Sequence, residues 1–275
     1  MEQVQLAVGD FVFETRAAGP VDGEVVLLLH GFPQTSYCWR HQQRALADAG
    51  YRVVAPDQRG YSAGARPDPV AAYHPERLVE DTIGFADALG AERVHLVGHD
   101  FGGLVVWHTG ARHPDRLATL TSVSTPHPRA VTRSILEGGE QAEKSSYMLF
   151  FRSPEAEPFF LDNDAAGLRL VYTGLDDTAD YVRVLTEPGA MTAALNWYRA
   201  LDRDVVESMG PITTPTLYAW STDDVALGRV AAEETAQYVD GPYRFEVLEG
   251  ISHWIPEQAP DELSALLLDH LATAR

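Results

Sequence analysis

Residues 94–103 read VHLVGHDFGG, an apolar run that passes into a helical pattern through a turn with an aspartate at its centre. So sharp a turn needs small residues at Gly98 and Gly102, because larger side chains there would clash. The turn raises Asp100 above the end of the predicted strand and places it at a helix N-terminus, where the helix dipole favours a negative charge. We therefore predict a nucleophile elbow in which Asp100 is the attacking group. The simpler alternative is a strand-to-helix turn with Asp100 as a helix cap.

Short apolar runs and helical patterns alternate on both sides of this elbow. We predict strands at residues 4–8, 11–17, 25–30, 52–56, 94–98, 117–122, 216–220 and 245–248. We predict helices at residues 36–49, 75–89, 101–112, 228–239 and 260–274. The first two strands are typical of an antiparallel edge. The whole alternation predicts an α/β fold with a mostly parallel, eight-stranded sheet and helices on both faces.

The pattern changes between residues 127 and 209, where aromatic side chains are dense and no buried strand is evident. The aromatic residues of this segment include Tyr147, Phe150, Phe151, Phe159, Phe160, Tyr172, Tyr181, Trp197 and Tyr198. We predict that residues 127–209 form a helical cap, inserted into a core made of residues 1–126 and 210–275. Most of these rings are expected to fill a second, smaller hydrophobic core.

Composition narrows the class of protein and the kind of partner. The chain has 40 acidic residues against 21 lysines and arginines, a net charge of −19, and none of the basic patches that nucleic-acid binding requires. An anionic membrane would repel such a chain, and the apolar run at residues 25–29 is far too short to span a bilayer. Residues 1–10 do not resemble a signal peptide, and the single cysteine, Cys38, has no partner for an internal disulfide. We therefore predict a cytoplasmic protein whose partner is a small molecule.

A second motif, HGFP at residues 30–33, comes at the end of a predicted buried strand. The turn would leave the backbone N–H of Phe32 pointing toward the end of the sheet. Together with the N–H of Phe101 at the elbow, it predicts an oxyanion hole. A plain βα turn is the alternative.

A general base and its orienting acid are expected after the last two strands. His253, in GISHW at residues 250–254, would overhang the edge of the sheet, whereas the other histidines are more typical of structural roles. One carboxylate of STDD at residues 221–224 should bind His253 and fix its tautomer. The residues alone leave the choice between Asp223 and Asp224 open.

These motifs resemble the epoxide hydrolase branch of the α/β-hydrolase family over nearly the whole chain. The matching stretches are HGFP (30–33), DQRGYS (57–62), the Asp100 elbow, LNWYR (195–199), the aspartate loop and GISHW (250–254). In that family the acid is followed by apolar residues and a leucine, a pattern that residues 224–227 fit, so the resemblance selects Asp224. It implies that epoxides are opened to vicinal diols through an alkyl ester on Asp100, without a metal or an organic cofactor.

The resemblance also gives the cap a role. The family uses two cap tyrosines to hydrogen-bond the epoxide oxygen, and Tyr198 matches one of them. The residue that aligns with the other is Phe150, which has no hydroxyl; Tyr147, about one helical turn earlier, is the candidate substitute, and Tyr172 is a weaker one. Phe150, Tyr147 and Trp197 are expected to bind the substrate, and the many aromatic rings suggest a medium-sized apolar one.

Two other functions stay open at this point. A dehalogenase acting on haloalkanes or haloacids would use the same aspartate, histidine and aspartate. Haloalkane dehalogenases usually place a tryptophan after the nucleophile as a halide donor, whereas the ring of Phe101 has no N–H. Fluoroacetate dehalogenases place arginines beside the elbow, whereas Arg112 lies a full helix away. A non-catalytic binding protein on the same scaffold would not need an intact triad. Nothing in the sequence specifies an oligomeric state.

Overall fold

The computed structural model describes residues 1–274 and contains an eight-stranded sheet in the order β1-β2-β4-β3-β5-β6-β7-β8. The strands are β1 (Glu2–Val8), β2 (Phe11–Ala18), β3 (Val25–Leu29), β4 (Arg52–Pro56), β5 (Val94–His99), β6 (Leu117–Val123), β7 (Thr216–Asp223) and β8 (Tyr243–Ser252). β1 pairs antiparallel with β2 and β2 with β4, whereas all other neighbours are parallel. The predicted sheet is confirmed, including its antiparallel edge.

The central strands β3 and β5 are buried apolar runs. Residues 26–29 of β3 and residues 96–97 of β5 have no exposed surface, as expected where helices cover both faces of a parallel sheet. Leu29 pairs with Gly98 at the ends of these strands. The chain therefore brings the HGFP turn and the elbow to the same edge of the sheet.

The helices of the core match the predicted alternation with small changes at their ends. They are η1 (Ser36–Trp39), α1 (Arg40–Asp48), η2 (Ala63–Ala65), η3 (Val70–Tyr73), α2 (Pro75–Ala88), α3 (Phe101–Arg112), η4 (Pro114–Arg116), α11 (Arg229–Glu234), η5 (Thr235–Tyr238), α12 (Ile255–Gln258), α13 (Pro260–Leu271) and η6 (Ala272–Ala274). α1 packs against α13, and α2 packs against α3. The helix expected at residues 36–49 begins with a 3-10 turn, and those expected at 228–239 and 260–274 end in one.

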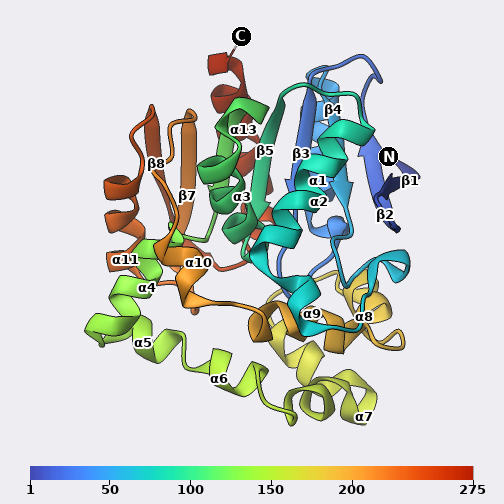
Figure 1. The fold of residues 1–275 in the computed structure, drawn as a ribbon, viewed down its shortest axis with the longest axis vertical. Coiled ribbons are helices and arrows are strands. Elements are labelled where there is room, and N and C mark those ends of the chain that lie inside the picture. The colour runs from blue at the N-terminus through green and yellow to red at the C-terminus, as the bar shows by residue number, and fades with distance from the viewer. Residues whose placement is uncertain (275) are drawn as a thin grey trace.

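Between β6 and β7 the chain forms a row of helices. They are α4 (Pro128–Glu137), α5 (Glu140–Lys144), α6 (Tyr147–Phe151), α7 (Ala156–Val171), α8 (Ala179–Leu185), α9 (Ala190–Arg199) and α10 (Arg203–Glu207). Figure 1 shows α5 to α9 along one end of the sheet, below it in this view. They lie within the segment expected to be a cap, and we keep that name for residues 127–209. No helix in residues 1–274 is long and apolar enough to cross a membrane.

β7 and β8 are longer than the sequence predicts. Their pairing runs from Thr216 opposite Tyr243 to Asp223 opposite Ser252, across a register irregularity after Ser221. The apolar pattern ends earlier than the ladder does, because β7 ends in polar residues and the pattern in β8 is broken by Glu249 and Gly250. As a result, the residues that follow the two strands emerge together at the end of the sheet that carries the elbow.

Candidate active site

Asp100 lies in the turn between β5 and α3. Its backbone has φ 53° and ψ −121°, a conformation that costs free energy for a residue with a side chain. Glycines permit the turn: a Cβ on Gly98 would lie 2.2 Å from the carbonyl oxygen of Gly102, and one on Gly102 would lie 2.1 Å from that of Leu29. The fold thus presents the Asp100 carboxylate at the end of β5 and the N-terminus of α3.

Two backbone N–H groups bind the Asp100 carboxylate. The N–H of Phe32 donates to Oδ1 at 2.8 Å, and the N–H of Phe101 also donates to the carboxylate. Gly31 allows this close approach, because a Cβ there would lie 2.3 Å from the Cβ of Asp100. The structure therefore brings together the two amides expected to form an oxyanion hole.

His253 lies between two carboxylates. Its Nε2 is 3.4 Å from Oδ2 of Asp100, and its Nδ1 is 2.8 Å from Oδ2 of the buried Asp224. Asp223 is exposed, and its Oδ1 accepts a hydrogen bond from the hydroxyl of Thr222 at 3.2 Å. Of the two neighbouring aspartates, the structure brings Asp224 to His253 and leaves Asp223 outside the site.

Burial and charge act in opposite directions on the ionisation of these groups. Burial alone would lower the pKa of His253, but the carboxylates of Asp224 and Asp100 raise it well above its ordinary value. Burial alone would raise the pKa of Asp100, but the hydrogen bond and the charge of His253 lower it overall. The resting site is therefore an ion pair in which Asp100 is ionised, the form required of a nucleophile.

His99 and His30 are buried beside this ion pair and are neutral. Burial lowers the pKa of each to about 4. Nε2 of His99 lies 2.8 Å from the carbonyl oxygen of His253, so the neutral ring donates its N–H there. His30 accepts the N–H of Gln58 at Nε2 and therefore donates from Nδ1 to the carbonyl oxygen of Gly31. Both rings support the loops of the site.

Tyr198 of α9 and Tyr147 of α6 line the same cavity as Asp100. Their ring centroids are 6.3 Å apart, and a hydrogen bond joins their hydroxyl groups. Burial raises the pKa of both, so both stay protonated at neutral pH and keep a proton to donate. The hydroxyl of Tyr172 is already engaged, since it donates to the carbonyl oxygen of Pro33. The second cap hydroxyl at the site is therefore that of Tyr147.

Two cavities meet at Asp100, Tyr147 and Tyr198. The larger one has a volume of about 340 Å³, and its further lining includes Phe32, Phe151, Val171, Val225, Ala226, His253 and Trp254. The smaller one has a volume of about 120 Å³, and its further lining includes Leu104, Val131, Ile135, Met148, Leu201 and Leu227. Both linings are mainly apolar, so an uncharged substrate fits them better than an ionic one.

Phe150 lies away from both cavities, contrary to expectation. Its side chain is 36% exposed, and its ring packs on Phe159 with centroids 5.2 Å apart. Phe151 lines the larger cavity instead. The reason is helical geometry: Phe150 and Phe151 are adjacent in α6 and point about 100° apart, so that only Phe151 faces the larger cavity.

Trp197 also lies outside the two cavity linings. It is buried, and its indole N–H donates to the carbonyl oxygen of Arg59 at 2.9 Å. Its ring meets the edge of Phe101 at 5.4 Å between centroids. Trp197 therefore packs behind the wall of the site and lines neither cavity, so the structure does not place it where the sequence analysis expected it.

The sequence analysis missed the contribution of α4. Val131, Thr132 and Ile135 of this helix line the smaller cavity. Their spacing predicts a common helix face. That spacing alone does not distinguish a face packed on the core from one that borders a cavity.

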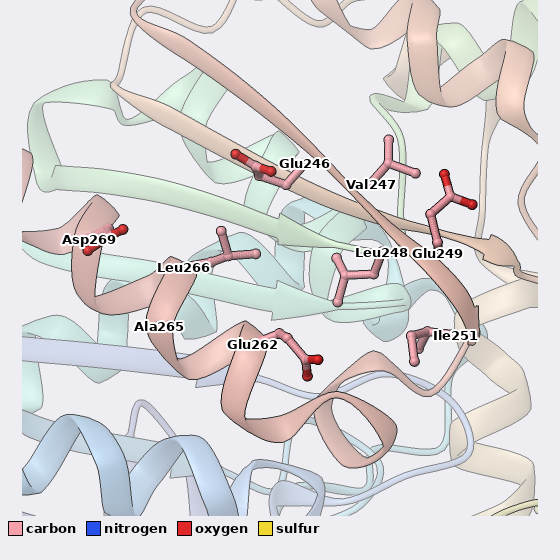
Figure 2. Close-up of a pocket in the computed structure, with 9 residues that line it drawn as sticks. All are labelled: Glu246, Val247, Leu248, Glu249, Ile251, Glu262, Ala265, Leu266 and Asp269. Atoms are coloured by element: carbon pink, nitrogen blue, oxygen red, sulfur yellow. The ribbon is translucent and has the colours of Figure 1, made fainter.

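A separate groove of about 440 Å³ lies between β8 and α13. Figure 2 shows the carboxylates and apolar side chains that line it, namely Glu246, Glu249, Glu262, Asp269, Val247, Leu248, Ile251, Ala265 and Leu266. None of these belongs to the triad, and the lining contains acids without a nucleophile or a base beside them. This groove therefore lies apart from the cavities at Asp100 and shares no residue with them.

Comparisons with known proteins agree with this geometry. A family model described as the alpha/beta hydrolase fold matches residues 24–260. The chain is 37% identical to the AB hydrolase superfamily protein YfhM of Bacillus subtilis, over 93% of this chain and 92% of that protein. It is 35% identical to epoxide hydrolase A of Mycobacterium tuberculosis, over 92% of each chain. The crystal structure of epoxide hydrolase A from Mycobacterium thermoresistibile superimposes with a TM-score of 0.85 at 32% identity, over 98% of each chain. The chain therefore belongs to the α/β-hydrolase fold family, in the branch that includes the epoxide hydrolases.

Proposed function

We propose that this protein hydrolyses epoxides to vicinal diols through a covalent alkyl ester on Asp100. The observation that carries the proposal is the pairing of groups in one cavity. An ionised aspartate, held by an oxyanion hole and a histidine, shares that cavity with two hydrogen-bonded tyrosine hydroxyls. The first set can form and hydrolyse an ester, and the second can protonate an opening ring.

In the first step, Asp100 attacks an epoxide carbon. Oδ1 is bound by the N–H of Phe32, which leaves Oδ2 as the attacking oxygen. The Oδ2–carbon bond forms as the carbon–oxygen bond of the epoxide breaks, and the departing oxygen keeps the electron pair. Tyr198, assisted by Tyr147, supplies the proton that this oxygen needs.

In the second step, His253 removes a proton from water, and the water oxygen adds to the carbonyl carbon of the Asp100 ester. The negative charge then develops on Oδ1, at the N–H groups of Phe32 and Phe101. Collapse breaks the bond between that carbon and Oδ2, and His253 returns a proton to the departing diol oxygen. Asp224 holds the imidazole in the required tautomer throughout.

Esterification itself prepares His253 for its role as a base. In the resting enzyme two carboxylates raise the pKa of His253 and keep it protonated. The ester removes the charge of Asp100, so that only Asp224 continues to raise this pKa. His253 therefore releases its proton more readily in the ester than in the free enzyme. Passed through water, that proton replaces the one that Tyr198 gave to the ring oxygen, and neutral His253 can then act as a base. After hydrolysis, the carboxylic acid of Asp100 gives its proton to His253, which restores the resting ion pair.

A halide-releasing reaction is less well supported by the same residues. A departing halide needs no proton but benefits from N–H donors, and the ring of Phe101 supplies none. The indole N–H of Trp197 is already bound to the carbonyl oxygen of Arg59. We further propose that the substrate is small and apolar, that residues 127–209 act as its cap, and that the protein works in the cytoplasm.

The proposal is tested by trapping the ester. His253→Gln should still form the ester but not hydrolyse it, so the peptide that contains Asp100 should gain the mass of one substrate when the variant is mixed with styrene oxide. Mass spectrometry of a protease digest measures this directly. An unmodified Asp100 peptide in this variant, across a panel of apolar epoxides, would contradict the proposed function.

A further inference from the structure

The loop that carries Asp224 is partly exposed. Val225 is 76% exposed. Within the loop, Oδ1 of Asp224 accepts the N–H groups of Ala226 and Leu227 at 2.8 and 2.9 Å. These bonds fix the carboxylate relative to its own loop. The position of the whole loop then determines how well Oδ2 of Asp224 meets His253.

Gln141 of α5 binds this loop at two points. Its Nε2 donates to the carbonyl oxygen of Ala226 at 2.9 Å, and its Oε1 accepts the N–H of Gly228 at 2.7 Å. The same Nε2 donates to Oγ of Ser145 at 2.9 Å, which ties the amide to its own helix. The side chain is 3% exposed. Because its donor and acceptor are both engaged, the amide has a single productive orientation.

Two neighbouring contacts support the same attachment. A Cβ on Gly228 would lie 3.3 Å from Oε1 of Gln141, so the absence of a side chain allows the cap to approach the loop. Lys144, one turn after Gln141, donates to the backbone carbonyl of Asp224. Residues of the short helix α5 therefore contact the loop at three places: its start at Asp224, its middle at Ala226 and its end at Gly228.

We propose that Gln141, a cap side chain that lines neither substrate cavity, is a positioning residue that holds the Asp224 loop, and through it the imidazole of His253, for hydrolysis of the ester on Asp100. This inference rests on the proposed function. It makes the second chemical step depend on the cap, although all groups that perform that step belong to the core.

The charges around His253 determine what loss of Gln141 should do. The titratable groups that face its ring are Asp100, Asp224 and the neutral His99, whose ring centroid is 4.8 Å away. Once Asp100 is esterified, Asp224 is the remaining charge that raises the pKa of His253. A displaced Asp224 would raise the pKa of His253 less. Because ester hydrolysis requires neutral His253, its rate should then reach its plateau at a lower pH.

The test compares the two steps in Gln141→Leu, which removes both bonds to the loop at similar side-chain size. Rapid-quench mass spectrometry with styrene oxide gives the rates of ester formation and ester hydrolysis across a range of pH. Hydrolysis should slow by about 10- to 100-fold, the range typical of a small misplacement of a catalytic group. Its pH midpoint should move down, and ester formation should change far less.

Ser145→Ala is the matched control, because it removes the bond of Gln141 to the residue that follows α5 and leaves both bonds to the loop. It should keep the rates and the midpoint of the unaltered enzyme. Gly228→Ala weakens the same attachment from the loop side and leaves the sequence of α5 intact. It should slow ester hydrolysis relative to ester formation, as Gln141→Leu does. If Gln141→Leu does not fold, Gly228→Ala provides the test.

Unchanged ester hydrolysis in Gln141→Leu or in Gly228→Ala would overturn the inference. So would an equal slowing of both steps with an unmoved pH midpoint, which would mark Gln141 as a merely structural part of the cap. The proposed function fails separately: if His253→Gln traps no ester on Asp100, the mechanism itself is wrong, whatever the Gln141 variants do.

Discussion

Asp100 and Tyr198 face the same cavity, but the core and the cap hold them in different ways. Asp100 is fixed by backbone: the end of β5, the turn at Gly98 and the N–H of Phe32 leave it little freedom. Tyr198 is fixed by neighbouring side chains, since its ring packs against Phe101 at 4.6 Å and its hydroxyl bonds to Tyr147. Backbone positions follow from the fold, whereas side-chain positions depend on which residues happen to meet.

The comparison explains a division of labour in the proposed mechanism. The core supplies the groups that make and hydrolyse the ester, on strand ends that also build the sheet. The cap supplies the proton donors and the walls that choose a substrate. Substitutions in the core should therefore stop a chemical step, whereas those in the cap should reduce a rate or alter selectivity. Gln141 is the exception, because it lies in the cap and acts on the core.

The largest effect should come from the acid of the core. Asp224→Asn keeps the size of the side chain but removes the charge that fixes the tautomer of His253, and a comparable change in a serine triad costs about 10⁴-fold. Ester hydrolysis should slow by roughly that amount while ester formation continues. Asp223→Asn is the control, because Asp223 is exposed and outside the site. A larger effect at Asp223 in single-turnover kinetics would show that the wrong neighbour was chosen.

The next largest effect should come from the cap hydroxyls. A positioned general acid is worth about 10²–10⁴-fold in rate. Tyr198→Phe and Tyr147→Phe together should slow ester formation by roughly that range, with little effect on hydrolysis. Each single variant should lose less than the pair, because the hydroxyls are hydrogen-bonded to each other and one remains. Stopped-flow rates of ester formation measure this. A double variant as fast as either single one would mean that the proton comes from elsewhere.

The two steps should also differ in their dependence on pH. The pKa of Asp100 is lowered, so the nucleophile stays ionised and ester formation should persist well into the acid range. Hydrolysis needs neutral His253, and Asp224 raises the pKa of that group, so hydrolysis should fall as pH falls, about tenfold per unit below the midpoint. The ester should therefore accumulate at low pH in the unaltered enzyme. Rapid-quench mass spectrometry that found more ester at high pH would reverse this assignment.

The smallest effect separates two neighbouring rings of α6. Phe151→Ala enlarges the larger cavity and should weaken the binding of an apolar epoxide by about 10- to 100-fold, within the cost of deleting a large side chain from an apolar wall. Phe150→Ala should leave the KM within about threefold, since exposed positions contribute little. Steady-state KM values for the two variants provide the comparison. An equal increase in KM for both variants would indicate that Phe150 contacts the substrate after all.

The contrast between core and cap also separates what the sequence predicts from what it does not. α3 begins at Phe101 and ends at Arg112, as predicted. The glycines of the elbow and the apolar periodicity are local signals, so they can be read from the sequence alone. His253 follows from its place after the last strand, since parallel strands bring their ends to one edge. The choice of Asp224 over its neighbour needed the resemblance to a family, because adjacent residues share every local signal.

The cap resisted prediction for a physical reason. α6 has five residues, too few for periodicity to define a face, so Phe150 was assigned a place that Phe151 occupies. Trp197 lies in the same matching segment as Tyr198, but neighbours on a helix point about 100° apart. The two bonds of Gln141 to the Asp224 loop join residues more than eighty positions apart, and no local pattern encodes such contacts.

The covalent ester on Asp100 is the central claim, and an isotope experiment tests it most directly. A single turnover of an apolar epoxide by excess enzyme in ¹⁸O-labelled water should release a diol without label, because the added oxygen comes from Oδ2 of Asp100. The label should appear in the carboxylate of Asp100, where water has attacked. A fully labelled diol from the first turnover, with an unlabelled Asp100, would mean that water opens the ring directly and would contradict the mechanism.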